Sequence, residues 1–335
     1  DDDDDDDDYD DDDDGAPQDC TLVKPAAYYG EASNNVSGGE DVTMGLKVIS
    51  LRAKNPSKGL PLAPATIMLW DGPSGIVKAT IAGTHLTVMR TSAGPALAVQ
   101  HLKPNCQDLV VFGAGAQAKC HIELIEHVLK TRNQRLQNIT IINRTLKNAD
   151  KLKEKLLEQR LKEQETADTS TTSAAVIKTV ALDDVDGISN ALSTADVICT
   201  TTNTTSPLWE GTATKLKNGC LITSIGSYTP GMQEIPSEIV DRSHVIIDTP
   251  EALAVGDLKH LNASVDDVDF AGDVFSNPQP FLGKVAATVT KNDQCQPKDY
   301  IVYKAVGTAI QDVLTAKAVM DNAKQLGLGQ DVDMS

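Results

Sequence analysis

The sequence predicts an α/β protein in which a doubly wound parallel sheet is inserted into a smaller, split α+β part. Three observations predict this fold class. From residue 108 onward short apolar runs alternate with helical patterns, a glycine-rich turn opens the alternation, and a strand-rich stretch precedes it. We expect residues 105–302 to form the sheet domain, and residues 15–104 with 303–335 to form the split part.

The first part of the chain is expected to begin as loop and to continue as strands. Residues 15–45 are rich in Gly, Pro, Ser and Asn and predict mostly loop. Strands are predicted at 45–51, 65–70 and 76–82, with the last two joined as a hairpin or meander through the turn at 71–75. A helical pattern follows from Thr84 to Leu102, and Pro95 within it predicts a kink or a break.

The second part predicts six parallel strands with helical crossovers. The strands are expected at 109–113, 139–145, 175–180, 196–202, 221–227 and 244–248. The clearest crossover helices are expected at 117–130 and 146–164. Residues 299–326 are predicted to form one long amphipathic helix that ends at Gly327.

The composition excludes several classes of protein. The first 14 residues hold 13 aspartates, and removing these charges from the net charge of −18 leaves −5 for the rest. This run is expected to be a solvated tail or a segment whose true residues are not represented. The sequence has neither a basic patch with interleaved aromatics nor an apolar run of membrane-spanning length, so nucleic acid and membrane are not expected partners.

The six cysteines form no CxxC pair, and several lie in apolar runs. This usage is typical of reduced, buried thiols and predicts a cytoplasmic protein. The histidines lack the spacing of a metal site, so no metal is expected.

The glycine-rich turn predicts a dinucleotide site. It reads Gly113-Ala114-Gly115-Ala116-Gln117-Ala118 between an apolar run and a helical pattern. Gly113 permits the tight turn, Gly115 allows a pyrophosphate to approach the backbone, and Ala116 and Gln117 begin the helix whose free N–H groups attract phosphate.

The end of the next strand predicts which nucleotide binds. It carries Asn143, Arg144 and Thr145, where a carboxylate would hydrogen-bond the ribose 2′-hydroxyl of NAD(H). An arginine and a hydroxyl suit a 2′-phosphate, so NADP(H) is favoured over NAD(H). The alternative is that Arg144 is a solvated residue at a helix start. We also expect the cofactor to lie along two further strand ends, at Thr200, Thr201 and Thr202 and at Ser224, Ile225 and Gly226.

Several ordered segments together resemble the ornithine cyclodeaminase/mu-crystallin family. They are MRTSAG (89–94), VVFGAGAQA (110–118), NRT (143–145), DVICTTTNTTSPLW (196–209), IGSYTPGMQE (225–234), EALAVGDL (251–258) and VYKAVGTAIQD (302–312). The resemblance covers roughly residues 45–335. It implies a homodimer in which a Rossmann domain is inserted into a split dimerisation and substrate domain.

The resemblance also implies site residues. The family's strand lysine corresponds to Lys47 and the arginine of its ARTAA-like motif to Arg90, and both would hold a substrate carboxylate. Without the resemblance, Lys47 fits a solvent-facing strand position and Arg90 an exposed helix position. By resemblance alone, Val306 and Gly307 approach the nicotinamide.

Two departures from the family matter. A further carboxylate-binding arginine lies upstream in the family, and no matching segment is found here. Cyclodeaminases carry an aspartate base two residues after the glycine of the loop that follows the fifth strand, where this chain has Tyr228. Tyrosine is a poor base near neutral pH but can donate a hydrogen bond.

The sequence therefore favours an NADPH-dependent reductase of a small, cyclic α-imino acid, with the proton supplied by Tyr228, Lys47 or water. Two alternatives stay open: an ornithine cyclodeaminase with recycled NAD, and a non-catalytic protein that binds NADPH and a small ligand. The loops at 52–64, 203–213 and 265–285 are expected to shape the substrate pocket.

Overall fold

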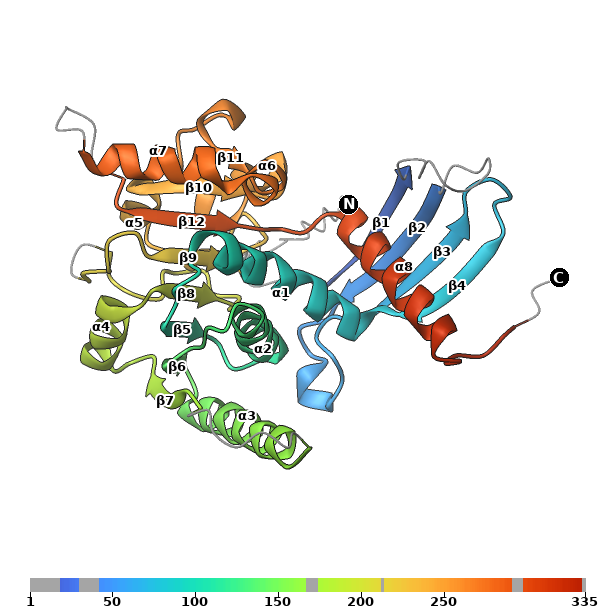
Figure 1. Ribbon diagram of the computed structural model, residues 1–335, viewed down its shortest axis with the longest axis horizontal. Coiled ribbons are helices and arrows are strands. Elements are labelled where there is room, and N and C mark those ends of the chain that lie inside the picture. The colour runs from blue at the N-terminus through green and yellow to red at the C-terminus, as the bar shows by residue number, and fades with distance from the viewer. Residues whose placement is uncertain (1–18, 30–41, 167–173, 212–213, 291–297, 333–335) are drawn as a thin grey trace, which may run out of the picture.

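The computed structural model describes residues 19–29, 42–166, 174–211, 214–290 and 298–332. These residues form two β-sheets, and the long helix α1 (Gly83–Leu102) runs from one to the other (Figure 1). The polyaspartate run lies outside the described residues.

The larger sheet is parallel throughout and confirms the predicted fold class. Its strands are β5 (Asp108–Phe112), β6 (Asn138–Asn143), β7 (Val176–Ala181), β8 (Val197–Thr200), β9 (Leu221–Ser224), β10 (Ser243–Ile247), β11 (Asp269–Phe270) and β12 (Tyr300–Lys304). They lie in the order β11-β10-β12-β9-β8-β5-β6-β7. The order reverses between β5 and β8, and open α/β sheets bind ligands beyond the strand ends at such a switch point.

Helices cover both faces of this sheet and enclose two apolar cores. One face packs against the second half of α1, α2 (Ala116–Lys130), α3 (Leu146–Thr166), α6 (Ala271–Ser276) and α7 (Pro278–Thr290). The other face packs against α4 (Val185–Thr194), α5 (Ser237–Asp241) and the chain around Trp209.

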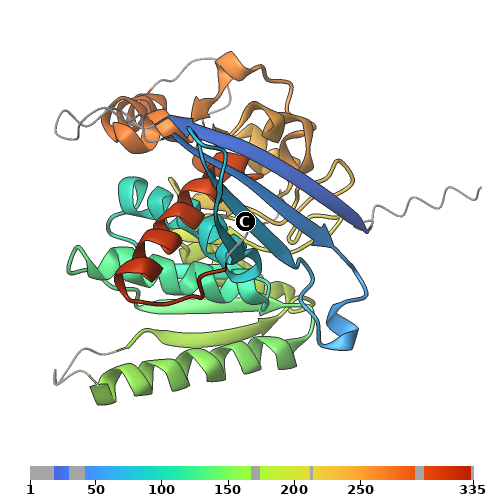
Figure 2. The same cartoon turned by 90° about the vertical axis from the view of Figure 1, so that its right-hand side faces the viewer.

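The smaller sheet is antiparallel and follows chain order, from β1 (Cys20–Tyr29) through β2 (Val42–Leu51) and β3 (Ala65–Asp71) to β4 (Val77–Ala82). The C-terminal helix α8 (Ala309–Gln325) lies across one face of it (Figures 1 and 2). Ile67 and Leu69 of β3 pack there against Val313 and Ala316 of α8. This face is therefore closed by a helix from the far end of the chain.

The prediction of mostly loop at 15–45 is wrong for β1. This strand pairs with β2 over ten residues, from Cys20↔Leu51 to Tyr29↔Val42. Pro25 and two alanines obscure its alternation in the sequence. Proline is tolerated because β1 is an edge strand, where a missing N–H breaks no ladder on the open side.

The single helix predicted at 299–326 is also wrong in its first part. Residues 300–304 form β12, which is fully buried between β9 and β10. Gly307 has a left-handed φ of 80° and forms a turn between β12 and α8. Thr308 and Gln311 form a capping box at the helix start. The parallel sheet therefore has eight strands in the described chain rather than six, since β11 also joins it.

The remaining differences are local. α1 continues through Pro95 without a break, and the expected loop at 265–285 contains α6 and part of α7. The division into two domains stays a prediction, and β12 crosses its predicted boundary at residue 302. No helix among the described residues is long and apolar enough to cross a membrane.

Candidate active site

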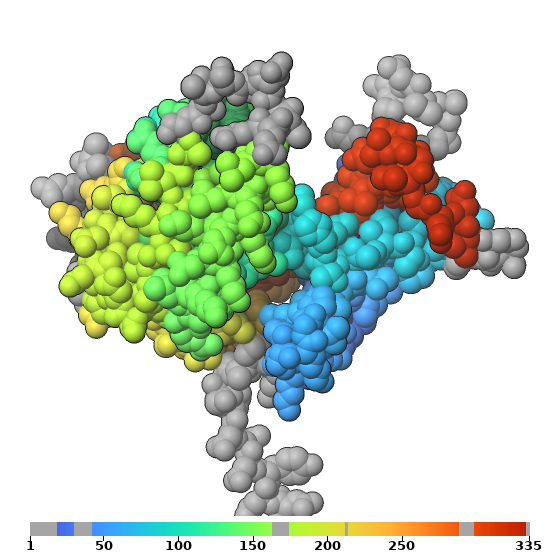
Figure 3. All heavy atoms as spheres, turned by 90° about the horizontal axis from the view of Figure 1, so that it is seen from below, coloured from blue at the N-terminus to red at the C-terminus, as the bar shows by residue number. Residues whose placement is uncertain are grey.

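A cavity of about 360 Å³ opens where the smaller sheet faces the carboxyl edge of the larger one. Its walls come from β1, β2, α1, the ends of β8, β9 and β12, and the 52–64 loop. Figure 3 shows this loop (light blue) beside the parallel-sheet part with a hollow between them. The cavity brings together ten predicted site residues: Lys47, Arg90, Gln117, Thr201, Thr202, Ile225, Gly226, Tyr228, Val306 and Gly307.

Three cations share one carboxylate at one end of this cavity. Lys47 Nζ lies 2.7 Å and Arg90 Nε 2.9 Å from Asp312 Oδ1. Lys24 Nζ lies 3.9 Å from Asp312 Oδ2. The Lys47 and Asp312 side chains are fully buried, whereas Arg90 is 9% and Lys24 21% exposed. Asp312 and the nearby Asp248 together cannot balance three cations, so the cluster attracts a further anion.

The excess positive charge is visible in the lysine pKa values. Burial and the nearby Arg90 guanidinium lower the pKa of Lys47 to about 8, against the opposing effect of Asp312. Burial and Arg90 also lower the pKa of Lys24. An incoming carboxylate would stabilise both ammonium groups.

The turn after β12 fixes the position of Arg90. A Cβ at Gly307 would displace the Arg90 guanidinium, and the left-handed φ of 80° also favours glycine there. The Asp248 carboxylate accepts hydrogen bonds from the N–H groups of Val306 (3.1 Å) and Gly307 (2.7 Å). Lys24 Nζ donates to the carbonyl of Gly307 at 3.0 Å. This turn is therefore held from two sides next to the cation cluster.

The glycine-rich turn has the geometry of a phosphate site. Gly113 has φ 111°, and a Cβ there would lie 2.5 Å from Thr201 Oγ1. At Gly115 a Cβ would meet nothing within 4 Å, so the backbone faces open space. α2 begins at Ala116 with no side-chain cap, which leaves its first N–H groups for a ligand.

The residues predicted to select the nucleotide lie at the end of β6, beside β5. Asn143 Nδ2 donates to the Thr145 carbonyl at 2.9 Å, which shapes this turn. Arg144 and Thr145 are exposed. The three residues present a guanidinium and a hydroxyl to solvent but no carboxylate.

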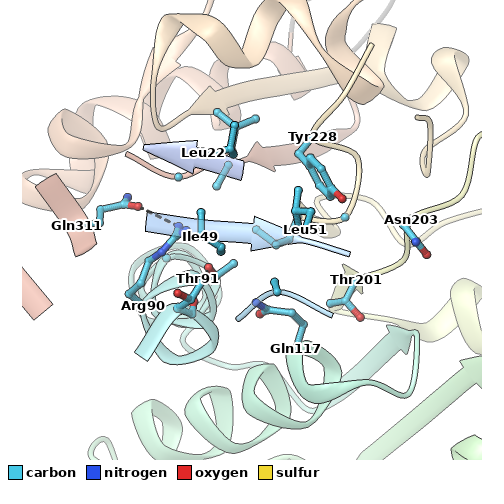
Figure 4. A pocket seen from close by; sticks show the side chains of 18 of the residues that line it. Leu22, Ile49, Leu51, Arg90, Thr91, Gln117, Thr201, Asn203, Tyr228 and Gln311 are labelled. Carbon is cyan, nitrogen blue, oxygen red and sulfur yellow. Dashed lines mark hydrogen bonds between the residues drawn. The ribbon is translucent and has the colours of Figure 1, made fainter. Parts of the chain in front are cut away.

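Tyr228 lines the opposite side of the cavity from Arg90 (Figure 4). Burial raises the pKa of its phenol above the usual value. The group therefore stays protonated near neutral pH and can donate a hydrogen bond but cannot act as a base.

A second charged cluster lies beneath the cavity and has no exposed member. Glu234 accepts hydrogen bonds from Thr200 Oγ1 (2.8 Å), Thr202 N (2.6 Å) and Gly226 N (2.8 Å). It thus ties the end of β8 to the end of β9. Burial and the neighbouring Asp257 raise the pKa of Glu234 to about 7.

Asp257 and Lys304 complete this cluster. Asp257 accepts from the backbone N–H of Ile235 at 2.8 Å and from the Ser224 hydroxyl. Lys304 Nζ lies 3.6 Å from Asp257 Oδ2 and donates to Ser224 Oγ at 3.0 Å. The side chains of Thr200 and Ser224, both predicted to line the cofactor, are therefore fully buried and occupied by protein partners.

Sequence reasoning missed several of these groups. Lys24 lies in the segment expected to be loop, and Asp312 was given no role although it ends one of the segments that carry the family resemblance. Glu234, Asp257 and Lys304 fall within segments that carry the family resemblance, which is the one signal that marked them. The register of β1 on β2, which only the structure shows, brings Lys24 opposite Lys47.

The sequence matches the model of the ornithine cyclodeaminase/mu-crystallin family over residues 34–327. The chain belongs to this family. The match confirms the resemblance, and the site described above is therefore a site within that family's fold.

Individual relatives agree with this membership. An uncharacterized cyclodeaminase from Dictyostelium discoideum is 30% identical over 308 residues, which is 88% of this chain and 80% of that protein. A Δ1-pyrroline-2-carboxylate reductase from Bacillus cereus is 28% identical, over 87% of this chain and 80% of its own length. A solved Δ1-pyrroline-2-carboxylate reductase from Thermococcus litoralis, in complex with NADH and L-proline, has a TM-score of 0.68 at 23% identity, covering 93% of this chain and 90% of the other.

Proposed function

We propose that this chain is an NADPH-dependent reductase of a small α-imino acid, a ketimine carboxylate. The observation that carries the proposal is the cation cluster around Asp312, which adjoins a cavity that also reaches Gln117 at the start of α2. A carboxylate held by the cluster would place the adjacent C=N carbon inside the cavity. The pyrroline-2-carboxylate reductases among the relatives act on this class of compound.

The residues present fit a nicotinamide dinucleotide. The open space at Gly115 and the uncapped N–H groups of α2 suit a pyrophosphate, and the exposed Arg144 guanidinium suits a 2′-phosphate. Thr201, Thr202, Ile225 and Gly226 line the cavity between this turn and the cation cluster. When bound, the reduced nicotinamide supplies the hydride that converts C=N to CH–NH.

The chain's own residues bind and orient the imino acid. Arg90 suits bidentate contact with a carboxylate, and Lys24 is the most exposed of the three cations. Lys24 lies upstream of Lys47 on the adjacent strand, so we assign to it the role for which the family resemblance implies an arginine. Lys47, fully buried on Asp312, adds charge that fixes the orientation.

The proton balance favours reduction over deamination. Reduction needs one proton on the imine nitrogen, which the Tyr228 phenol, the Lys47 ammonium or water can supply. Cyclodeamination needs a base at the position of Tyr228, and a tyrosine with a raised pKa does not act as one.

We also propose that the protein is a homodimer. The face of the smaller sheet away from α8 exposes apolar side chains, among them Val23 (61% exposed), Tyr29 (71%), Met44 (42%) and Val48 (38%). An apolar patch on a sheet face is typical of an interface, and a second copy would cover it by symmetry.

One assay tests the proposed function against its alternatives. The protein is incubated with NADPH and piperideine-2-carboxylate or pyrroline-2-carboxylate, and in parallel with ornithine and NAD⁺. We expect NADPH absorbance to fall with the cyclic imines and no ammonia from ornithine. Ammonia release would support a cyclodeaminase, and NADPH binding without either reaction would support a binding protein.

A further inference from the structure

β1 and β2 pair along the cavity wall. We call the opposed pair Lys24 and Lys47 the lysine rung, and the opposed pair Leu22 and Ile49 the leucine rung. Lys24 lies directly opposite Lys47, and Leu22 lies directly opposite Ile49. All four side chains line the cavity. The two rungs are two residues apart along each strand, which corresponds to about 6.8 Å. The wall thus changes from cationic to apolar within the length of a small ring.

The helix α8 covers only the other end of this wall. Beyond the lysine rung, Gly45 is so close to Val313 that a Cβ would lie 2.6 Å from its Cγ2. At the lysine rung, α8 contacts the sheet through an ion pair between Asp312 and Lys47 rather than through apolar side chains. At the leucine rung the helix has ended, and the Leu22 side chain is 46% exposed.

Two further leucines extend the apolar region. Leu51 lines the cavity beyond Ile49, and Leu62 reaches it from the 52–64 loop with 40% exposure. Figure 4 shows Leu22, Ile49 and Leu51 on neighbouring strands at the cavity. Exposed leucines that line a concave site are buried when an apolar group enters.

We propose that Leu22, Ile49, Leu51 and Leu62 form a specificity wall that receives an uncharged hydrocarbon flank of the substrate. The inference rests on the proposed function and narrows it to monocarboxylic imino acids whose ring or side chain is apolar. The carboxylate binds at the lysine rung, and the hydrocarbon part lies against the leucine rung.

The wall rejects a second charge. Among the described residues that line the cavity there is no aspartate or glutamate to hold a distal ammonium group. The three lining cations all converge on Asp312, so none serves a carboxylate at the leucine rung. A charged group moved from water to this wall loses its hydration without gaining a partner.

The first experiment compares two substrates that share the same reacting group, a C=N carbon next to a carboxylate. The ratio of kcat/KM for piperideine-2-carboxylate to that for iminosuccinate, formed from oxaloacetate and ammonia, is measured with NADPH. We expect a ratio of at least about tenfold in favour of the hydrocarbon ring. A ratio of one or below overturns the inference.

A matched pair of variants tests the wall itself. Leu62→Lys places a charge in the cavity, whereas Leu60→Lys makes the same change two residues earlier, at a side chain that is 53% exposed and does not line the cavity. We expect Leu62→Lys to lower the preference for the hydrocarbon ring by about tenfold or more and Leu60→Lys to leave it unchanged. Equal effects of the two substitutions overturn the wall.

A binding measurement separates this inference from the proposed function. The fluorescence of bound NADPH is titrated with L-pipecolate, L-aspartate and L-ornithine. Tighter binding of L-pipecolate supports the wall even where no imine is reduced, in which case only the proposed function fails. Equal or tighter binding of the charged amino acids, or no binding of any, overturns the wall.

Discussion

Asp312 organises the charges of the site. As an anion it does not bind a substrate carboxylate itself, but it positions the cations that can. It holds Lys47 and Arg90 within 3 Å and leaves the Lys24 side chain partly exposed. The arrangement keeps two cations oriented before a substrate arrives, so the carboxylate meets a preorganised site. Single residues at this cluster and at the predicted cofactor site lead to three predictions.

Gly307 should control substrate binding through Arg90. Gly307→Ala should raise KM for the imino acid about tenfold or more, because the new Cβ displaces the guanidinium. Gly75→Ala is the matched control: Gly75 has φ 70°, close to 80° at Gly307, but a Cβ there meets nothing within 4 Å. Both variants should lose about 1–2 kcal/mol of stability because alanine must adopt a left-handed φ, and a similar KM in both would contradict the role given to Arg90.

Carboxylate binding should weaken as Lys47 loses its proton. With a pKa of about 8, Lys47 is protonated below that value and neutral above it. The inhibition constant of pyrrole-2-carboxylate, whose ring nitrogen does not titrate in this range, should therefore rise from pH 8 to pH 10. A constant value across that range would show that the Lys47 charge does not contribute to binding.

Arg144 should decide between the two nucleotides. Arg144→Asp should shift the ratio of affinities toward NADH by at least about tenfold, because a carboxylate repels a 2′-phosphate and hydrogen-bonds a 2′-hydroxyl. Lys147→Asp, three residues later at the start of α3, is the control for a general loss of positive charge. An unchanged ratio in Arg144→Asp would remove this residue from the cofactor site.

At the scale of elements, the sequence identified the strands that are short, apolar and followed by clear turns. β5, β6, β7 and β10 lie where the apolar runs predicted them. β12 was misassigned because YIVYK is a fully buried run without alternation, and such a run does not distinguish strand from helix. β1 was missed because its conformation depends on pairing with β2 rather than on its own composition.

The candidate site was predictable only in part, because some of its residues are brought together by the fold alone. Lys47, Arg90 and Tyr228 were found by family resemblance, and the structure places all three at one cavity. Asp312 could not be found, because it is 265 residues from Lys47 and only the fold makes them neighbours. Thr200 and Ser224 were predicted to line the cofactor, because the sequence does not reveal their buried partners Glu234 and Asp257.

The ends of β8 and β9 should depend on Glu234 for their relative position. Glu234→Gln replaces one acceptor oxygen with a donor that faces other donors, so the two ends should loosen. We expect the Kd for NADPH to rise by several-fold and the free energy of unfolding to fall by about 1–3 kcal/mol. Glu238→Gln, on the exposed side of α5, should change neither quantity. An unchanged Kd in Glu234→Gln would limit this residue to a purely structural role.

At the scale of the whole molecule, the smaller sheet has one face closed by α8 and one apolar face open. Val48→Lys on the open face should convert the dimer to a monomer, measured by sedimentation, because each copy would bury an unpaired charge. Val185→Lys, at a valine of 70% exposure on α4, should leave the assembly unchanged. A wild-type protein that sediments as a monomer would contradict the proposed dimer.

The proposed reaction is hydride transfer to the carbon of a C=N bond beside a bound carboxylate. The most direct measurement uses NADPH deuterated at both C4 positions with piperideine-2-carboxylate, and analyses the amino acid product by mass spectrometry. We expect one deuterium at the α-carbon of the product and one NADPH oxidised for each molecule formed, and hydride transfer of this kind requires both. The proposed reaction is contradicted if the product is unlabelled, or if the protein converts ornithine to proline with ammonia release and no net oxidation of cofactor.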